Sequence, residues 1–285
     1  MNVLIADPAR GVSIIRGEDP PLSVPCDAES PCMPAAAPGR LIVLSQKSRD
    51  CHVLRREDHR PEIRFPAPPG TSALCPSPCG RWLYLLGSDA DTVHAVHLGT
   101  GQLHYAHPAG VFPRSMRLSR DGRLLLVAGG AENEATLFSA PELLPAAVVH
   151  TRHPCFAADF WQRGLVLVCA AEGEDIQTVV YTLPEGRRRP REILRLPGLP
   201  GALTVCPDGL SALVSTPDGL MKIDLLTGDL QWNLPQAALC MGVCCQGGSL
   251  LLSDLPDGPV VLCPVRQPWP RRTLWPRGDA QACFI

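Results

Sequence analysis

The stretch SPCGRWLYLLGSDADTVHAVHLGTGQLHYAHPAG, residues Ser77–Gly110, decides the fold. Its short apolar or alternating runs are typical of β-strands, and turn sequences rich in Gly, Asp and Thr separate them. Together with one run just before it, the stretch predicts an up-and-down sheet of four antiparallel strands. The four runs are Ser72–Cys75, Trp82–Leu86, Val93–Leu98 and Leu103–His107.

The same unit recurs along the chain, and a glycine that ends a tight turn before an apolar run marks each copy. Successive glycines are 41, 42, 42, 45 and 39 residues apart, a spacing typical of propeller blades. We expect positive φ at these glycines, because other residues adopt it only at a cost. They are Gly39, Gly80, Gly122, Gly164, Gly209 and Gly248.

A seventh sheet should form from the two ends of the chain. Residues 2–24 supply three strands with no partner strand ahead of them, and residues 280–285 supply one strand. Pairing them closes the ring and removes the exposed edges of an open sheet. We therefore expect an all-β, seven-bladed β-propeller of four-stranded antiparallel blades, in one domain spanning 1–285. The expected blades are 278–285 with 1–27, then 28–69, 70–110, 111–152, 153–197, 198–236 and 237–277.

Composition argues against several classes of protein. Twenty-six Lys and Arg against 28 Asp and Glu leave a formal net charge of −2, so no strong field recruits nucleic acid or an anionic membrane surface. The longest apolar runs, such as 165–171, fall far short of the roughly 18 residues of a membrane span. The N-terminus has no basic region ahead of its apolar stretch, so we expect no secretory signal and a cytoplasmic protein.

The 13 cysteines do not form the spaced framework of a disulfide-rich secreted domain, so we expect free thiols. Cysteines at i and i+4 of a strand lie about 13 Å apart, which is too far for one zinc ion. Cys32 and Cys240 could meet across the channel mouth, but buried cysteine acting as a small hydrophobic residue is the favoured interpretation. We therefore expect neither a bound metal nor a cofactor.

Two motifs carry a resemblance to a known family. SPCGRWLYLLGSDADTVHAVHLGTG (77–101) and FPRSMRLSRDGRLLLVAGG (112–130) resemble the SPDGxxLYVxN…xVxVIDxxTG repeat of the YVTN-type seven-bladed propellers, which include the lactonase-like propellers. Cys206–Gly209 and Ile223–Gly228 match the same two pieces again. The resemblance implies a propeller and leaves the activity open, because this fold hosts enzymes, cofactor binders and scaffolds.

In such a blade the first strand lies nearest the axis, and every second residue of it faces the central channel. Seven residues before each turn glycine stand mostly small residues, among them Cys32 and Ser115, as a crowded axis requires. Five residues before it stand Arg117 and Asp159, at equivalent depths on adjacent blades. This pair is either a structural ion pair, which we favour, or part of a polar ligand site.

Arg114 should lie near the mouth of the channel. The resemblance gives it the place of the arginine in the family's Pro-Arg-His entry, where ligands are contacted, and it puts Ser115 in the place of the histidine. A lactonase built this way would lack its proton-transfer residue. A solvated Arg114 with no ligand is the alternative.

The loops between the second and third strands of three successive blades are acidic. They should emerge on the face that also carries the blade-to-blade crossovers, and a basic turn at 185–191 should lie on the opposite face. Carboxylates there could hold a hard cation or attract a basic partner, although turn chemistry alone also favours Asp and Glu. This acidic rim comprises Asp89, Asp91, Glu132, Glu134, Glu172, Glu174 and Asp175.

Three functions compete. We favour a non-catalytic binding module that presents its crossover face to a protein or a small ligand, because no catalytic constellation is found. The alternative is a sugar-lactone hydrolase, which requires an axial pocket with a carboxylate and a second arginine or histidine. The third is a haem-type carrier, resembling propellers related to cytochrome nitrite reductases, with His153 as the axial ligand. The candidate ligand-binding residues are Arg114, Arg117, Asp159, Cys32, Ser115 and His153.

Overall fold

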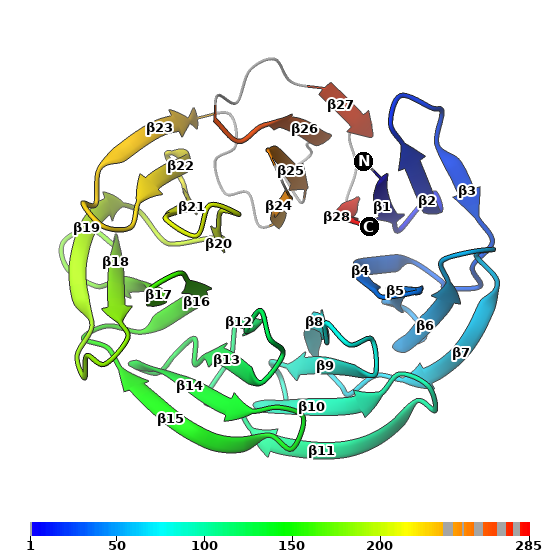
Figure 1. Cartoon of the computed structure of the whole chain (residues 1–285), viewed down its shortest axis with the longest axis horizontal. Helices are drawn as coiled ribbons and strands as arrows, with labels where there is room; N and C mark the ends of the chain where they lie inside the picture. The colour runs from blue at the N-terminus through cyan, green and yellow to red at the C-terminus, as the bar shows by residue number, and fades with distance from the viewer. Residues whose placement is uncertain (1, 236–241, 247, 254–258, 267–271, 276–279) are drawn as a thin grey trace.

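The computed structural model describes residues 2–235, 242–246, 248–253, 259–266, 272–275 and 280–285. In this part of the chain, strands form seven four-stranded antiparallel sheets, arranged around a central axis like the blades of a propeller (Figure 1). The prediction of a seven-bladed, all-β propeller is therefore confirmed.

Each blade places one strand at the axis and pairs the other three outward from it (Figure 1). The innermost strands are β28 (Gln281–Phe284), β4 (Pro31–Ala37), β8 (Thr71–Pro76), β12 (Ser115–Leu118), β16 (Cys155–Trp161), β20 (Leu203–Val205) and β24 (Gly242–Gln246). The second strands are β1 (Asn2–Asp7), β5 (Arg40–Ser45), β9 (Trp82–Gly87), β13 (Leu124–Ala128), β17 (Gly164–Ala171), β21 (Ser211–Thr216) and β25 (Ser249–Ser253).

The two outer strands of each blade lie toward the side wall of the ring (Figure 1). The third strands are β2 (Gly11–Arg16), β6 (Asp50–Arg55), β10 (Thr92–His97), β14 (Glu134–Ser139), β18 (Gln177–Pro184), β22 (Gly219–Asp224) and β26 (Val260–Pro264). The outermost strands are β3 (Leu22–Val24), β7 (Pro61–Pro66), β11 (Gln102–Pro108), β15 (Leu144–His150), β19 (Arg191–Pro197), β23 (Leu230–Leu234) and β27 (Arg272–Trp275).

The two ends of the chain close the ring. Strand β28 pairs with β1 in antiparallel register, from Val3 opposite Phe284 to Ala6 opposite Gln281. The seventh blade is also fastened to the first, because the indole N–H of Trp275 on β27 donates to a carboxylate oxygen of Asp7 at 2.7 Å. Pairing of the terminal strands thus completes the first blade as a four-stranded sheet.

The turn glycines behave as expected at five of six positions. Five of them have positive φ, between 66° and 143°. At Gly248 an added Cβ would meet nothing within 4 Å, so the space around it does not require glycine. The five that need glycine are Gly39, Gly80, Gly122, Gly164 and Gly209.

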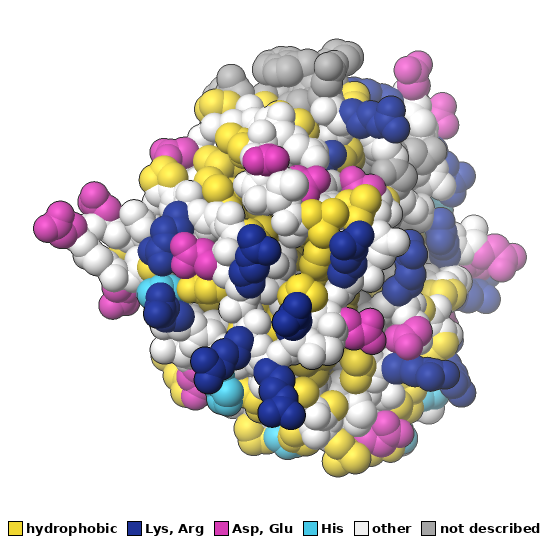
Figure 2. Space-filling model, turned by 60° about the vertical axis from the view of Figure 1, so that its left-hand side comes forward, with side chains coloured by type: hydrophobic (Ala, Val, Ile, Leu, Met, Phe, Trp, Pro, Cys, Tyr) yellow, Lys and Arg dark blue, Asp and Glu magenta, His cyan; other side chains and the backbone are white. Residues whose placement is uncertain are grey.

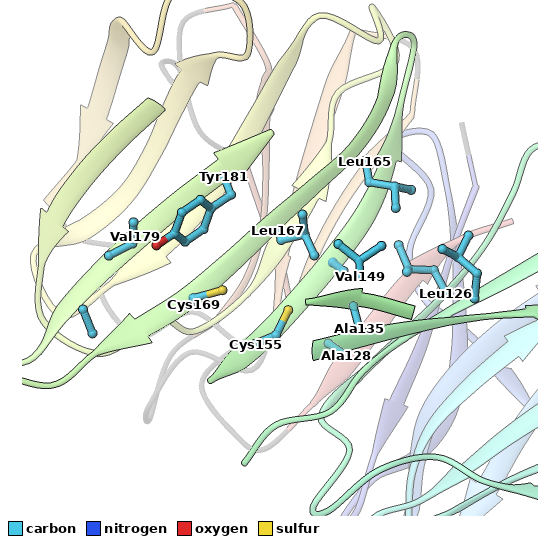
Figure 3. Close-up of a cluster of buried hydrophobic side chains, with 13 residues drawn as sticks. Leu126, Ala128, Ala135, Val149, Cys155, Leu165, Leu167, Cys169, Val179 and Tyr181 are labelled. Atoms are coloured by element: carbon cyan, nitrogen blue, oxygen red, sulfur yellow. The ribbon is translucent and has the colours of Figure 1, made fainter. Parts of the chain in front are cut away.

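The hydrophobic core lies between neighbouring blades rather than on the axis. Middle strands such as β17 are therefore buried on both faces, which explains their unbroken apolar sequences. Figure 3 shows one such layer, in which Leu126 and Val149 of one blade face Leu165 and Leu167 of the next. Met116, Phe160 and Leu203 of the inner strands also pack in these layers. The axis is lined by small and polar residues together with a few larger apolar ones, such as Phe156.

The inner strands are irregular at the end from which they start. The pairing of β4 with β5 shifts register between Cys32 and Ala35, with Met33 at a φ of 46°. Similar shifts occur in β8 between Thr71 and Ala73, and in β16 between Cys155 and Ala157. A bulge of this kind changes which side chains face the channel.

No helix in the described part of the chain is long and apolar enough to cross a membrane.

Candidate functional site

A cavity of about 320 Å³ lies on the propeller axis, where the inner strands begin. Its described lining comes from six blades, and the only charged side chains in that lining are two arginines. It is therefore a cationic pocket with neutral polar and apolar walls. The lining residues are Met33, Pro34, Ser72, Ala73, Arg114, Ser115, Met116, Arg117, Phe156, Ala157, Pro200, Gly201, Ala202, Leu203, Gln281 and Ala282.

Arg114 stands at the mouth of this cavity, directly before β12. Its backbone N–H donates to the carbonyl of Ala128 at 3.1 Å, which fixes the start of the strand. Its guanidinium lies over the ring of Phe156, 4.8 Å from the ring centroid. No carboxylate among the described residues forms an ion pair with this guanidinium, and Arg114 lines the cavity. A guanidinium that is held in place and unpaired is well suited to bind an anion.

Arg117 and Asp159 join three inner strands. The Arg117 guanidinium on β12 lies 3.7 Å from a carboxylate oxygen of Asp159 on β16 and donates to the carbonyl of Leu203 on β20 at 3.1 Å. The Asp159 carboxylate accepts backbone N–H groups from Phe160 at 2.8 Å and from Val205 at 2.9 Å. Both carboxylate oxygens are thus occupied by protein donors, which supports the structural interpretation of this pair.

The pKa of Asp159 reflects the position of its carboxylate beside Arg117. Burial raises the pKa of Asp159, and the Arg117 guanidinium and the two backbone N–H groups oppose that shift. Asp159 contacts the Arg117 guanidinium but does not line the cavity. The arginine therefore faces the cavity while its carboxylate partner does not.

Two neutral polar side chains complete the cavity. The Ser115 hydroxyl oxygen accepts the backbone N–H of Ala158 at 3.1 Å, so its own O–H proton remains available to another acceptor. The Gln281 side-chain carbonyl accepts the backbone N–H of Met33 at 2.7 Å, and Gln281 lines the cavity. Ser115 thus adds a hydroxyl donor beside the two arginines, and Gln281 adds an amide.

Two other predicted residues lie outside the axial cavity. Cys32 lines a neighbouring cavity of about 540 Å³, and the pairing of β4 with β5 shifts register directly after it. Burial raises the pKa of Cys32 to about 11, so its thiol stays protonated at neutral pH. His153 lies near Arg195 and Glu192 of the outer strand β19, and its Nε2 is buried without a hydrogen-bond partner. The suggested partner of Cys32, Cys240, is outside the described residues.

The acidic rim is less uniform than its sequence. Asp91 accepts the backbone N–H of Phe112 at 2.8 Å, and Glu134 lies 3.4 Å from His150, so both have local partners. Among the described residues, no three Asp, Glu, His or Cys side chains come together as a metal site would require. Glu172, Glu174 and Asp175 are exposed in the β17–β18 loop. The rim remains a prediction as a docking feature.

The basic turn between β18 and β19 begins beside the β16–β17 turn, at the end of the blade away from the crossovers, because Pro184 pairs with Gly164 and the backbone N–H of Glu185 donates to the carbonyl of Arg163 at 2.7 Å. On the side wall, Arg188 and Arg189 line a surface pocket together with Thr151 and Arg152. Figure 2, which brings this side of the ring forward, shows Lys and Arg side chains spread over the wall and separated by other residues. The expectation of one acidic and one basic face stays a prediction.

Comparison with known proteins places the fold. No known family profile matches the chain, and no curated protein matches its sequence. The putative 6-phosphogluconolactonase of Bacteroides uniformis is 14% identical, with 99% of each chain covered and a TM-score of 0.72. Hydrazine synthase of Kuenenia stuttgartiensis is 16% identical over 85% of this chain and 78% of that one, with a TM-score of 0.71. The dihydro-haem d1 dehydrogenase NirN is 18% identical over 82% of this chain and 53% of that one, with a TM-score of 0.63. At these identities the likeness shows a propeller fold shared with lactonase-like proteins.

Sequence reasoning missed three residues of the site. Phe156 and Gln281 line the axial cavity, and Phe112 lies on the adjacent surface. Phe112 and Phe156 precede or begin inner strands, where only the three-dimensional path of the crossovers shows that they meet. Gln281 could have been found by extending the channel count to the C-terminal strand.

Proposed function

We propose that the protein is a non-catalytic propeller that binds a small organic anion in its axial cavity. The observation that carries this proposal is the presence of Arg114, whose guanidinium has no carboxylate partner among the described residues, together with Arg117 in a cavity whose described lining contains no acidic side chain. Ser115 adds a hydroxyl donor next to them. Because each charge-assisted hydrogen bond is stronger than a neutral one, two arginines and a hydroxyl suffice to select a carboxylate or phosphate.

The experiment is a titration of the whole chain with acetate, succinate, citrate and inorganic phosphate, followed by ligand-observed NMR. At least one anion should bind, and Arg114→Gln should weaken it by about 10- to 100-fold, the effect of losing a hydrogen bond to a charged group. Arg120→Gln is the matched control, because Arg120 is an exposed arginine on the turn at the other end of β12. Equal binding by Arg114→Gln and the unchanged chain would refute the axial site.

A lactone hydrolase of the YVTN-type, lactonase-like group is the second candidate. The fold shared with the Bacteroides protein and the second arginine in the cavity, Arg117, favour it. Hydrolysis also needs a group that takes a proton from water. The described cavity lining offers neither a carboxylate nor a histidine, and Asp159 is engaged by backbone donors. Turnover of a plain or phosphorylated sugar lactone that disappears in Arg114→Gln would support this candidate over the non-catalytic one.

A histidine-ligated haem does not fit the described axial cavity. None of its described lining residues is a histidine, and His153 lies beside the outer strand β19. We therefore derive no haem chemistry for this site.

A further inference from the structure

We infer that the ligand of the axial site is an amphiphilic monoanion, a carboxylate with an acyl or aryl tail that lies against an apolar pocket beside Arg114. This inference rests on the proposed anion site and names the chemical class that the site takes. It separates this protein from a binder of sugar acids, which are polar along their whole length.

A second cavity of about 300 Å³ adjoins the axial one. Arg114 and Phe156 line both cavities, so their stacked side chains stand where the two meet. The remaining walls of the second cavity are mainly apolar and include Phe112, Ile176 and Leu199. These residues come from two crossovers and from the β17–β18 loop, which confirms that the crossovers and this loop share one face.

Large apolar side chains are left exposed around this second cavity. Phe112 is 61% exposed, Ile176 47% and Leu199 40%, and Val111 beside Phe112 is 41% exposed. Single exposed apolar residues are ordinary, but a contiguous group next to a binding cavity marks a surface that is covered in use. Here the group continues directly into the cationic cavity, so one ligand can cover both.

The backbone holds Phe112 in place before any ligand arrives. Phe112 has a φ of 49°, which is uncommon for a bulky residue, and its N–H is held by the Asp91 carboxylate at 2.8 Å. Its carbonyl oxygen packs so closely on Gly130 that an added Cβ there would lie 1.8 Å from it. Strained backbone that is fixed from both sides is typical of ligand-contacting loops. The aromatic ring is thus presented to the pocket at little further entropic cost.

The charges orient the ligand. Arg114 and Arg117 stand on the axial side, whereas Glu172 lines the outer side of the apolar pocket. An anionic head is attracted to the axis and repelled at the rim, so the tail points outward over Phe156 toward Phe112. A dianion with a charge at each end is disfavoured for the same reason.

The test measures the affinities of acetate, butanoate, hexanoate and octanoate, each below its aggregation concentration, by ligand-observed NMR with the full chain. Affinity should rise with length, by roughly fourfold for each methylene that becomes fully buried. Phe112→Ala and Leu199→Ser should flatten this rise. Leu144→Ala is the matched control, because Leu144 is 62% exposed on the outer strand β15 and lines neither cavity. Only variants whose melting temperature equals that of the unchanged chain are compared.

The outcomes separate the two proposals. If acetate binds and the affinities do not rise with chain length, the amphiphilic ligand is refuted while the anion site stands. If affinity rises with length equally in Phe112→Ala and Leu199→Ser, the tail lies elsewhere and the inference is wrong. If none of these acids binds while inorganic phosphate, succinate or citrate does, the amphiphilic ligand is refuted and the anion site stands; if no anion binds, both proposals fail.

Discussion

Replacing Arg117 by methionine should destabilise the protein through the contacts that join three blades. The change removes the hydrogen bond to the Leu203 carbonyl at 3.1 Å and the contact with Asp159 at 3.7 Å. The first is worth about 1 kcal/mol net. The second is worth about 0.5–1 kcal/mol, because the arginine side chain is 41% exposed and solvent screens the pair. The expected loss is therefore about 1.5–2 kcal/mol, or a fall in melting temperature of about 2.5–3.5 °C.

Urea unfolding of the unchanged chain, Arg117→Met, Asp159→Asn and the double variant measures this loss and the coupling between the two side chains. A coupling of about 0.5–1 kcal/mol is expected. Arg123→Met is the matched control, because Arg123 is 85% exposed and lies 3.9 Å from a carboxylate oxygen of Asp121. That control should change stability by less than about 0.5 kcal/mol. Equal effects of Arg117→Met and Arg123→Met would refute the reasoning.

The effect of Arg117→Met should also depend on pH. Burial raises the pKa of Asp159 above its ordinary value of 3.8, so the folded state binds a proton more tightly there than the unfolded state does. The stability that this proton contributes is present at low pH and is lost as the pH rises through the raised pKa. Only the charged carboxylate needs the guanidinium. The difference between Arg117→Met and the unchanged chain should therefore be largest at neutral pH and shrink as the pH falls toward 3.8.

Three further changes probe the frame of the site. Trp275→Phe removes a buried hydrogen bond to Asp7 at 2.7 Å and should cost about 1–2 kcal/mol in urea unfolding. Burial raises the pKa of Asp7, but this bond and two backbone N–H groups lower it by more, so the net pKa is below 3.8. The stability that Asp7 contributes is therefore present above pH 3.8 and lost as the pH falls below it. The loss of stability caused by Trp275→Phe should accordingly be smaller in acid. Gly130→Ala should cost at least about 2 kcal/mol by displacing the Phe112 carbonyl, whereas Gly186→Ala, which meets nothing within 4 Å, should cost about 1 kcal/mol from its positive φ alone. Deleting residues 280–285 removes the strand that pairs with β1 and should lower the cooperativity of unfolding, seen as a smaller m-value; an unchanged m-value would contradict the role of closure.

The sequence predicts the fold because the repeat consists of turn glycines and short apolar runs, which are local signals. The positions of Ser115 and Arg117 on the cavity wall follow from the same count. Counting back from the turn glycine fails at Cys32, because a bulge in β4 interrupts the alternation of side chains. Bulges of this kind are hard to recognise in a sequence. The count also misses Phe112 and Phe156, because their neighbourhood is created by loops from different blades. Local patterns thus predict the frame, and the parts of the site built by long-range contacts need the structure.

The most direct measurement of the axial site is a crystal structure of the whole chain grown with hexanoate at saturating concentration. The carboxylate should lie within about 3.2 Å of the Arg114 guanidinium, a normal hydrogen-bond length, with its alkyl chain passing Phe156. The proposal would be contradicted by a structure in which hexanoate binds at another surface and no anion lies at the Arg114 guanidinium.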